Sequence, residues 1–184
     1  MSGKLTGKKI AILVEKGFEQ VELEKPKTAL EEAGAETHII SPKSGKVKAW
    51  DMTDWGKEFD VDKKLEDVVA ADYDGLLLPG GVMNPDYLRA NEQAVAFVRA
   101  FNESSKPIAA ICHGPWTLIE ADAVKGRQMT SWPSLRTDLT NAGANWVNEE
   151  VVTDKGLVTS RKPEDIPAFN KKMIEEFAEG VHNR

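Results

Sequence analysis

Four short runs typical of buried strands recur in the first 111 residues of this chain, and they constrain its fold more than any other feature. They lie at residues 8–14 (KKIAILV), 36–40 (ETHII), 75–78 (GLLL) and 108–111 (IAAI), and helical patterns separate them. Continuous apolar runs of this length are typical of parallel strands that are buried on both faces. Strand–helix–strand units need right-handed crossovers, which place helices on both sides of a sheet. The sequence therefore predicts an α/β fold, with a doubly wound, mostly parallel sheet sandwiched by helices.

The remaining segments continue this alternation with a few interruptions. Helical spacing is found at residues 19–33 or 23–33, 63–70, 92–101, 116–124, 133–142 and 163–179. Short strands are expected at 128–131, 145–147, 151–153 and 157–160, the last two forming an edge hairpin. Residues 47–52 and 59–61 fit either a small hairpin or a long loop, and residues 82–88 are expected to be a loop. Trp50 and Trp55 stand in this polar region and need a surface to cover, either in this domain or on another subunit.

The composition limits the classes of partner and the cellular location that this chain can have. The 184 residues carry a formal net charge of −6, which argues against nucleic acid or an anionic membrane as the main partner. The one cysteine permits no intramolecular disulfide, which fits a reducing cytoplasm. The apolar run at 10–14 is too short for a signal peptide or a membrane span. We expect a single domain over residues 1–184, located in the cytoplasm.

The fourth strand run ends at Cys112, and His113, Gly114 and Pro115 follow before another helical pattern. Strand, sharp turn and helix in this order are typical of a nucleophile elbow, in which the turn presents one side chain at the helix N-terminus. A thiol at this place is expected to ionise more readily than a free cysteine. The alternative is that Cys112 is a small buried hydrophobic residue, as many lone cysteines are.

Ligands of doubly wound sheets bind beyond the carboxyl ends of the strands. Three chemically distinctive segments follow strands that should end at this edge: Glu19 after the first run, Gly80-Gly81 after the third and Cys112-His113 after the fourth. Taken singly, Glu19 could be a solvated acid and the glycines a permissive loop. Together they predict one site.

Several motifs resemble the PfpI family, which belongs to the class I glutamine-amidotransferase-like superfamily. They are FEQVEL at 18–23, LPGG at 78–81, AICHGP at 110–115, TSWP at 130–133, NAGANWV at 141–147 and SRKPED at 160–165. The resemblance extends in register from about Lys8 to Phe177. It implies a flavodoxin-like fold.

The resemblance also implies roles for individual residues. Cys112 matches the family nucleophile, and Glu19 matches the acid whose carboxyl touches that thiol. Gly80 and Gly81 match a turn whose backbone N–H groups can form an oxyanion hole. His113 matches the family histidine, which an acid from a neighbouring subunit often orients.

Three further assignments concern the surroundings of this site. Asp86 is the candidate for the acid that orients His113, although the loop at 82–86 is one residue longer than is usual and carries Asp in place of Glu. The alternative for Asp86 is a charge at a helix N-terminus. Trp116 is bulkier than the residue many family members have there and is expected to narrow the pocket, and Arg161 is expected to close its rim.

The resemblance favours a cofactor-free, cysteine-dependent hydrolase that acts on reactive carbonyls or their adducts, a deglycase- or glyoxalase-like stress-protection enzyme. Two alternatives remain: an intracellular cysteine peptidase, and an oxidant-sensing or chaperone-like stress protein that uses Cys112 oxidation. We expect a homo-oligomer, at least a dimer, with small carbonyl compounds or glycated or peptide substrates as partners. His38, His113 and His182 show no metal-ligand spacing with Cys112, so no zinc site is expected.

Overall fold

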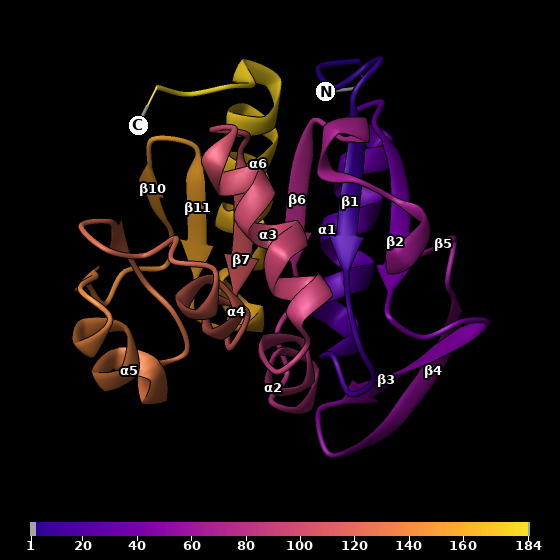
Figure 1. Ribbon diagram of the computed structural model, residues 1–184, viewed down its shortest axis with the longest axis horizontal. Helices are drawn as coiled ribbons and strands as arrows, with labels where there is room; N and C mark the ends of the chain where they lie inside the picture. The colour runs from indigo at the N-terminus through magenta and orange to yellow at the C-terminus, as the bar shows by residue number, and fades with distance from the viewer. Residues whose placement is uncertain (1–2, 184) are drawn as a thin grey trace.

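The computed structural model describes residues 3–183 and contains a seven-stranded sheet with helices on both faces (Figure 1). The strand order is β10-β11-β7-β6-β1-β2-β5. The strands are β1 (Lys9–Leu13), β2 (Glu36–Ser41), β5 (Lys63–Lys64), β6 (Gly75–Leu78), β7 (Ile108–Ile111), β10 (Val152–Asp154) and β11 (Leu157–Ser160). All neighbours pair in parallel except β10 and β11, which form the antiparallel edge hairpin. The predicted doubly wound, mostly parallel sheet is confirmed.

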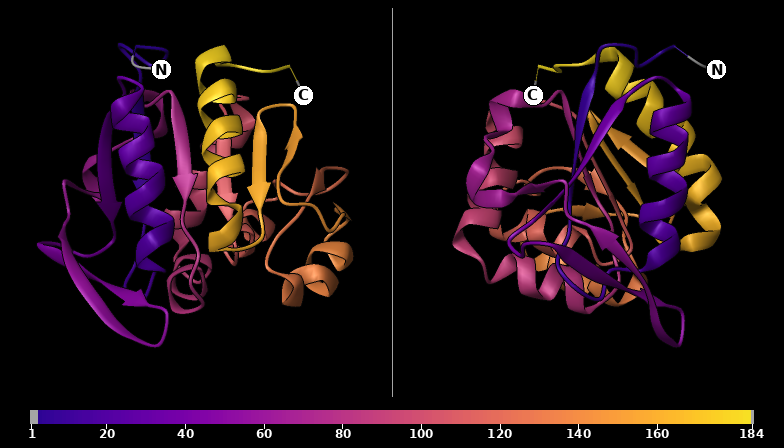
Figure 2. Two further views of the ribbon diagram at one scale, coloured as in Figure 1. Left: turned by 180° about the vertical axis from the view of Figure 1, so that it is seen from behind. Right: turned by 90° about the vertical axis from the view of Figure 1, so that its right-hand side faces the viewer.

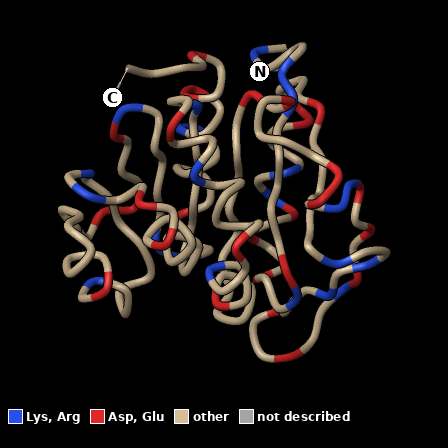
Figure 3. The backbone as a smooth tube through the Cα atoms, in the orientation of Figure 1, with Lys and Arg blue, Asp and Glu red and all other residues tan. Residues whose placement is uncertain are grey.

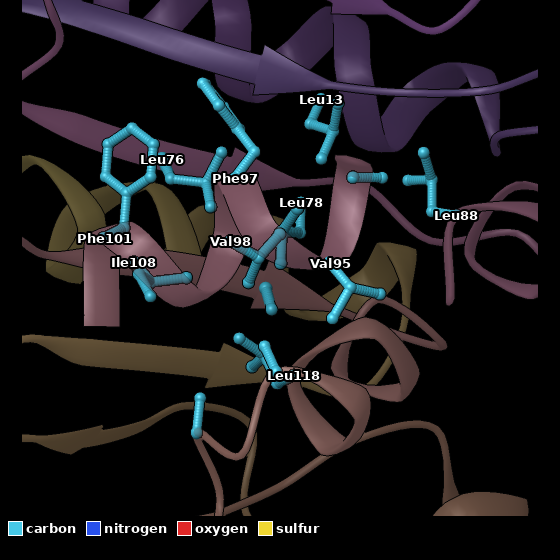
Figure 4. Packing of buried hydrophobic residues seen from close by; sticks show 14 of the residues in the cluster. Leu13, Leu76, Leu78, Leu88, Val95, Phe97, Val98, Phe101, Ile108 and Leu118 are labelled. Atoms are coloured by element: carbon cyan, nitrogen blue, oxygen red, sulfur yellow. The ribbon is translucent and has the colours of Figure 1, made fainter. Parts of the chain in front are cut away.

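Alternate residues of the central strands supply two separate hydrophobic layers. In β1, Ala11 and Leu13 face one layer, whereas Ile10 and Ile12 face the other, as the twofold period of a strand requires. Helix α3 (Glu92–Glu103) covers the first layer through Val95, Val98 and its two phenylalanines (Figure 4). Helices α1 (Gln20–Glu32) and α6 (Ile166–Glu179) lie side by side over the second layer (Figure 2).

A long hairpin projects beyond the sheet next to the carboxyl ends of its strands. It consists of β3 (Lys46–Asp51) and β4 (Asp54–Asp60), so the hairpin alternative for this segment is the one observed. Trp50 and Trp55 pair edge to face across it, with ring centroids 5.4 Å apart. Near its turn, the hairpin is tied to the first loop of the sheet, because the N–H of Trp50 donates to the carbonyl of Phe18.

Two segments differ from the sequence expectation. The helix expected at 63–70 is instead β5 followed by the short 3₁₀ turns η1 (Leu65–Asp67) and η2 (Ala70–Asp72). The loop expected at 82–88 is helix α2 (Met83–Arg89). Pro85 lies in the first turn of α2, where no intrahelical donor is needed, so this proline is compatible with a helix.

The remaining elements are short. They are α4 (Pro115–Glu120), β8 (Gln128–Met129), η3 (Pro133–Leu135), α5 (Arg136–Asn141), β9 (Asn145–Trp146) and η4 (Pro163–Asp165). Acidic and basic residues are interspersed along the backbone (Figure 3). Among residues 3–183, no helix has the length and apolar character needed to cross a membrane.

Candidate active site

Cys112 lies at a sharp turn between β7 and α4. Its φ is 61°, in the left-handed region that a residue with a side chain rarely adopts. The strain, on the order of 1–3 kcal/mol, is held by neighbouring hydrogen bonds, since the N–H of Cys112 donates to the carbonyl of Ser160 over 3.0 Å. Gly114 allows the turn to close, because a Cβ there would lie 2.6 Å from the Leu78 carbonyl oxygen. The nucleophile elbow predicted from the sequence is the local geometry observed.

The loop after β6 comes into direct contact with the elbow. A Cβ on Gly80 would lie 2.5 Å from Glu22 Oε1 and 2.6 Å from Cys112 Cβ, so only glycine fits at this position. The N–H of Gly81 donates to the Cys112 sulfur, and so does the N–H of His113. The N–H of Gly80 donates to Glu22 over 3.0 Å instead. The two donors that face the sulfur are therefore Gly81 and His113, whereas the N–H of Gly80, which was expected to help form an oxyanion hole, is bound by Glu22.

Asn84 locks this loop in place although the sequence analysis did not single it out. Its side chain is fully buried, and its Nδ2 donates to the carbonyls of Pro79 and Gly80, each over 3.0 Å. Its Oδ1 accepts from the N–H of Glu15 over 2.7 Å. One amide thus joins the loops that follow β1 and β6. It also fixes the Gly80–Gly81 peptide, whose N–H points at the sulfur.

The acid that faces the thiol is Glu22, not Glu19. Glu22 is fully buried, its Oε1 accepts from the N–H of Gly80, and its carboxyl interacts with the Cys112 thiol. No hydrogen bond from the described residues satisfies its other oxygen, Oε2. Glu19, by contrast, accepts from the N–H of Met52 over 2.9 Å and holds the tip of the β3–β4 hairpin. The expected contact of Glu19 with Cys112 is therefore wrong in this structure.

The start of α1 explains this correction. The helix begins at Gln20, so Glu19 is its N-cap residue and lies outside the first turn. Glu22 shares a face with Pro26 and Leu30, four and eight residues later, and all three are buried. This i, i+4, i+8 pattern is the sequence signal that could have identified Glu22, since one face of a helix recurs at this spacing.

Glu22 and Cys112 form a coupled titrating pair. Burial, and after it the charge of Glu19, raises the pKa of Glu22 to about 8. Burial and then the charge of Glu22 raise the pKa of the Cys112 thiol, whereas the N–H groups of Gly81 and His113 lower it. The expectation of a thiol pKa below the ordinary value is therefore wrong, since burial, the larger cause of the rise, acts whatever the charge of Glu22. Two acids in one buried site cannot both ionise readily, so the pair retains one proton over a wide pH range.

His113 is also buried, and its Nδ1 lies 3.2 Å from the Cys112 sulfur. Burial lowers the pKa of His113 to about 4, so the ring is neutral at pH 7. The ring stacks on Trp132 with centroids 6.1 Å apart and meets Trp116 edge to face at 5.0 Å. Two tryptophans therefore orient the imidazole.

Asp86 does not reach His113 within this chain. Its carboxylate accepts from Arg89 Nη2 over 2.8 Å, and among residues 3–183 no carboxylate forms an ion pair with His113. The guanidinium of Arg89 in turn lies 4.1 Å from the centre of the Trp116 ring. Asp86 therefore does not orient His113 within one chain, and a contact from a second subunit stays a prediction.

Trp116 and Arg161 also differ from the expectation. Trp116 packs behind His113 and donates its Nε1–H to Asp138, so it supports the imidazole and does not line the pocket. Arg161 forms a bidentate pair with Asp165 and contacts Asn148. It does not line the pocket, whose boundary at this place is formed by Pro163.

The thiol opens into a pocket of about 460 Å³. Its walls come from the loops after β1, β6 and β7, from the β3–β4 hairpin and from the segments before η3 and α6. They are mostly apolar and comprise Trp50, Met52, Val82, Met83, Trp132 and Pro163. Glu19, Glu22, Cys112 and His113 supply the polar side chains, and no described lysine or arginine lines the pocket. Trp132 and the two methionines were not predicted, because only the tertiary fold brings these loops together.

Comparison with known proteins identifies the family and agrees with this fold. The profile of the DJ-1/PfpI family matches residues 8–176. General stress protein 18 of Bacillus subtilis (strain 168) is 46% identical over 170 residues, 91% of this chain and 96% of that protein. The B. subtilis protein named "Putative cysteine protease YraA" is 45% identical, over 91% of this chain and 96% of that protein. Protein/nucleic acid deglycase 2 of Escherichia coli (strain K12) is 44% identical, with the same two coverages.

A solved structure gives the same result for the fold. The crystal structure of Drosophila melanogaster DJ-1beta superposes with a TM-score of 0.84 and 28% identity, covering 97% of this chain and 91% of that chain. Fold and site together define a doubly wound α/β protein with a cysteine at a nucleophile elbow. The chain belongs to the DJ-1/PfpI family.

Proposed function

We propose that this protein is a cofactor-free, cysteine-dependent enzyme that acts on α-oxoaldehydes or on their adducts with amines and thiols. The observation that carries the proposal is the pairing of Cys112 with the buried Glu22, whose pKa burial raises to about 8. A carboxyl that keeps its proton at pH 7 can donate a hydrogen bond to a thiolate and later pass that proton to a substrate oxygen. The relative named as a deglycase supports this choice of chemistry.

The first step would be addition of the Cys112 thiolate to the aldehyde carbon. A C–S bond forms, the π electron pair of the carbonyl moves to its oxygen, and that oxygen takes the proton of Glu22. The N–H groups of Gly81 and His113 face the sulfur and would stabilise the negative charge of the thiolate before it adds to the carbonyl carbon. Proton transfer from C1 to C2 through an enediol would then turn the thiohemiacetal into a lactoyl thioester. Water would cleave the C–S bond of this thioester, which releases lactate and regenerates the Cys112 thiol.

The neutral His113 ring is the second group that can move a proton. Its Nδ1 lies 3.2 Å from the sulfur, close enough to exchange a proton with it or with a sulfur-bound adduct. The apolar walls formed by Trp50, Met52, Met83 and Trp132 limit bulk water around such an adduct.

A side-by-side assay tests the proposal. Wild type and Cys112→Ala are given methylglyoxal, with lactate as the readout, and in parallel a set of unstructured peptides, with cleavage as the readout. We expect lactate formation by the wild type only. Peptide cleavage without lactate would favour the peptidase alternative, which the name of the relative YraA supports. Neither product, with Cys112 oxidised by peroxide, would favour the oxidant-sensor alternative. Equal unfolding midpoints show that Cys112→Ala is folded.

We also propose that the protein is a homo-oligomer whose interface adjoins the pocket. Met52, Trp55, Val82, Tyr87 and Trp132 are large apolar residues that are 39–64% exposed, and three of them line the pocket. Such a concentration of apolar surface is typical of an interaction site. An acid such as Asp86 of a second subunit could then approach His113. Light scattering should give at least twice the 20.3 kDa chain mass, and a monomer at micromolar concentration would contradict the proposal.

A further inference from the structure

A second cluster of chemically reactive side chains lies at the end of the sheet opposite to the pocket. Helix α6 ends there, and the C-terminal segment turns back beside it, whereas the arrowheads of the parallel strands point to the other end (Figure 1). Glu176, Glu179 and His182 follow one another at intervals of three residues. One ligand atom from each lies within 4.8 Å of the other two.

The innermost member is a buried carboxylate with an unsatisfied oxygen. Glu176 is only 9% exposed, and among the described residues its Oε2 has no hydrogen-bond partner. Its carboxylate also accepts from the N–H of Gly156, which fixes its position. His182 Nε2 lies 3.1 Å from Oε2 but is likewise buried without a hydrogen bond. The two atoms are therefore close together, but their relative orientation does not form a hydrogen bond.

The same spacing suits two ligands of one metal ion. Zinc binds imidazole nitrogen and carboxylate oxygen at about 2.0–2.2 Å, which separates neighbouring ligand atoms of a tetrahedron by about 3.3–3.6 Å. His182 Nε2 lies 3.1 Å from Glu176 and 3.4 Å from Glu179. A modest expansion would thus place all three atoms on one zinc ion. The free carbonyls at the helix C-terminus add negative potential at the same point.

We propose that Glu176, Glu179 and His182 form a binding site for a divalent transition-metal ion, with Zn²⁺ the ion that fits best. One imidazole nitrogen and two carboxylate oxygens match the preference of zinc, whereas Mg²⁺ and Ca²⁺ prefer oxygen ligands alone. The side chain of Glu179 is 62% exposed, so the fourth position faces solvent and can hold water. The expectation of no zinc site rested on the spacing of the histidines relative to Cys112, and this cluster of Glu176, Glu179 and His182 does not include Cys112.

A metal here would connect three separate parts of the fold. Glu176 belongs to α6 and is bound by the turn between β10 and β11 at Gly156. His182 belongs to the C-terminal segment, and its N–H donates to the carbonyl of Ser105, after α3. An ion held by both residues would fasten the C-terminal segment to the body of the sheet. The expected consequence is higher stability and not a change in the chemistry at Cys112.

Calorimetric titration of ZnCl₂ tests the site directly. The Cys112→Ala protein is the parent, because the thiol of the pocket is itself a zinc ligand. We expect one zinc per chain and a rise in the unfolding temperature on zinc addition. Glu179→Gln should weaken binding at least tenfold and abolish that rise. His182→Gln should do the same.

Glu175→Gln is the matched control, since Glu175 lies one position from the buried ligand but pairs with Lys172. It should bind zinc as the parent does. Because Glu179 is exposed, its substitution leaves the fold intact, and the comparison stays interpretable even if variants of Glu176 unfold. No zinc binding by the parent, equal affinity in Glu179→Gln and Glu175→Gln, or equal stabilisation by MgCl₂ would each overturn the proposal.

Discussion

Replacing Glu22 with glutamine separates two descriptions of the reactive pair. In the one favoured here, the carboxyl keeps its proton and donates to a thiolate. In the alternative, an ionised Glu22 accepts from a neutral thiol. Glutamine preserves the acceptor for the N–H of Gly80 and supplies an amide donor in a side chain of similar length that interacts with the Cys112 thiol. The glutamine side chain cannot carry the negative charge of an ionised Glu22.

The two descriptions predict shifts of different sign and size. If Glu22 is protonated, Glu22→Gln leaves the pKa of Cys112 within about half a unit of the wild-type value, and Glu22→Ala raises it by about one to two units. The rise corresponds to losing one charge-assisted hydrogen bond of about 1.5–3 kcal/mol, at about 1.4 kcal/mol per pKa unit. If Glu22 is ionised, removing its charge is worth up to about 4 kcal/mol at 4 Å and an effective dielectric constant near 20. Glu22→Gln would then lower the thiol pKa by as much as about three units.

The assay is the ultraviolet absorbance of the thiolate as a function of pH. Cys112 is the only cysteine in the chain, so the signal reports one group, and Cys112→Ala supplies the baseline. Glu24→Gln is the matched control, since Glu24 lies on the same helix but pairs with Lys57 and does not line the pocket. A fall of one unit or more in Glu22→Gln would refute the protonated carboxyl. An equal rise in the glutamine and alanine variants would refute its role as a donor.

Three further variants probe the loops around the thiol. Asn84→Ala removes a hydrogen bond from each of three buried backbone groups, of which the Gly80 carbonyl still accepts from the N–H of Glu19. It should cost at least about 2 kcal/mol in denaturant unfolding and alter the alkylation rate of Cys112. Gly80→Ala brings a Cβ within 2.8 Å of three atoms and should abolish turnover, whereas Gly126→Ala meets nothing within 4 Å. His113→Gln removes a base whose pKa is about 4 in the folded protein and about 6.5 unfolded. The folded wild type binds fewer protons in that window, so it should lose roughly 2 kcal/mol between pH 7 and pH 5, and His113→Gln should lack this loss.

Each of these expectations has a contrary result. Unchanged alkylation of Cys112 in a destabilised Asn84→Ala protein would reduce Asn84 to a purely structural residue. Equal turnover in Gly80→Ala and Gly126→Ala would show that the loop has room for a side chain. Parallel loss of stability by wild type and His113→Gln on acidification would show that the histidine is not held neutral by burial.

The sequence predicts the sheet and the elbow because both depend on local patterns. Short apolar runs such as residues 108–111, bounded by turn residues, are typical of buried strands. The residues Cys112-His113-Gly114-Pro115 after such a strand are typical of a sharp turn into a helix. The α2 helix was not predicted, and it contains Pro85, a residue type that breaks most helices when it lies in their interior. Its compatibility with a first helical turn becomes apparent only once the helix start is known.

The site was predicted less accurately because it depends on helix phase and on long-range packing. Glu19 and Glu22 differ by three residues, and only the start of α1 at Gln20 decides which one turns inward. Asp86, the acid predicted to orient His113, was expected to lie in a loop. Residues 83–89 form helix α2 instead, and on this helix Asp86 pairs with Arg89. Trp132, which stacks on His113, comes from a segment about 20 residues further along the chain. No local sequence pattern predicts such a contact.

The most direct test of the reactive pair is the infrared difference spectrum of wild type minus Glu22→Gln at pH 7. A buried carboxylic acid has a C=O stretch that is separate from the bands of an ionised carboxylate. The account predicts the protonated band of Glu22 in the wild type at pH 7, and it predicts that this band persists while the ultraviolet signal of the Cys112 thiolate appears at higher pH. Carboxylate bands from Glu22 together with a neutral thiol would contradict it.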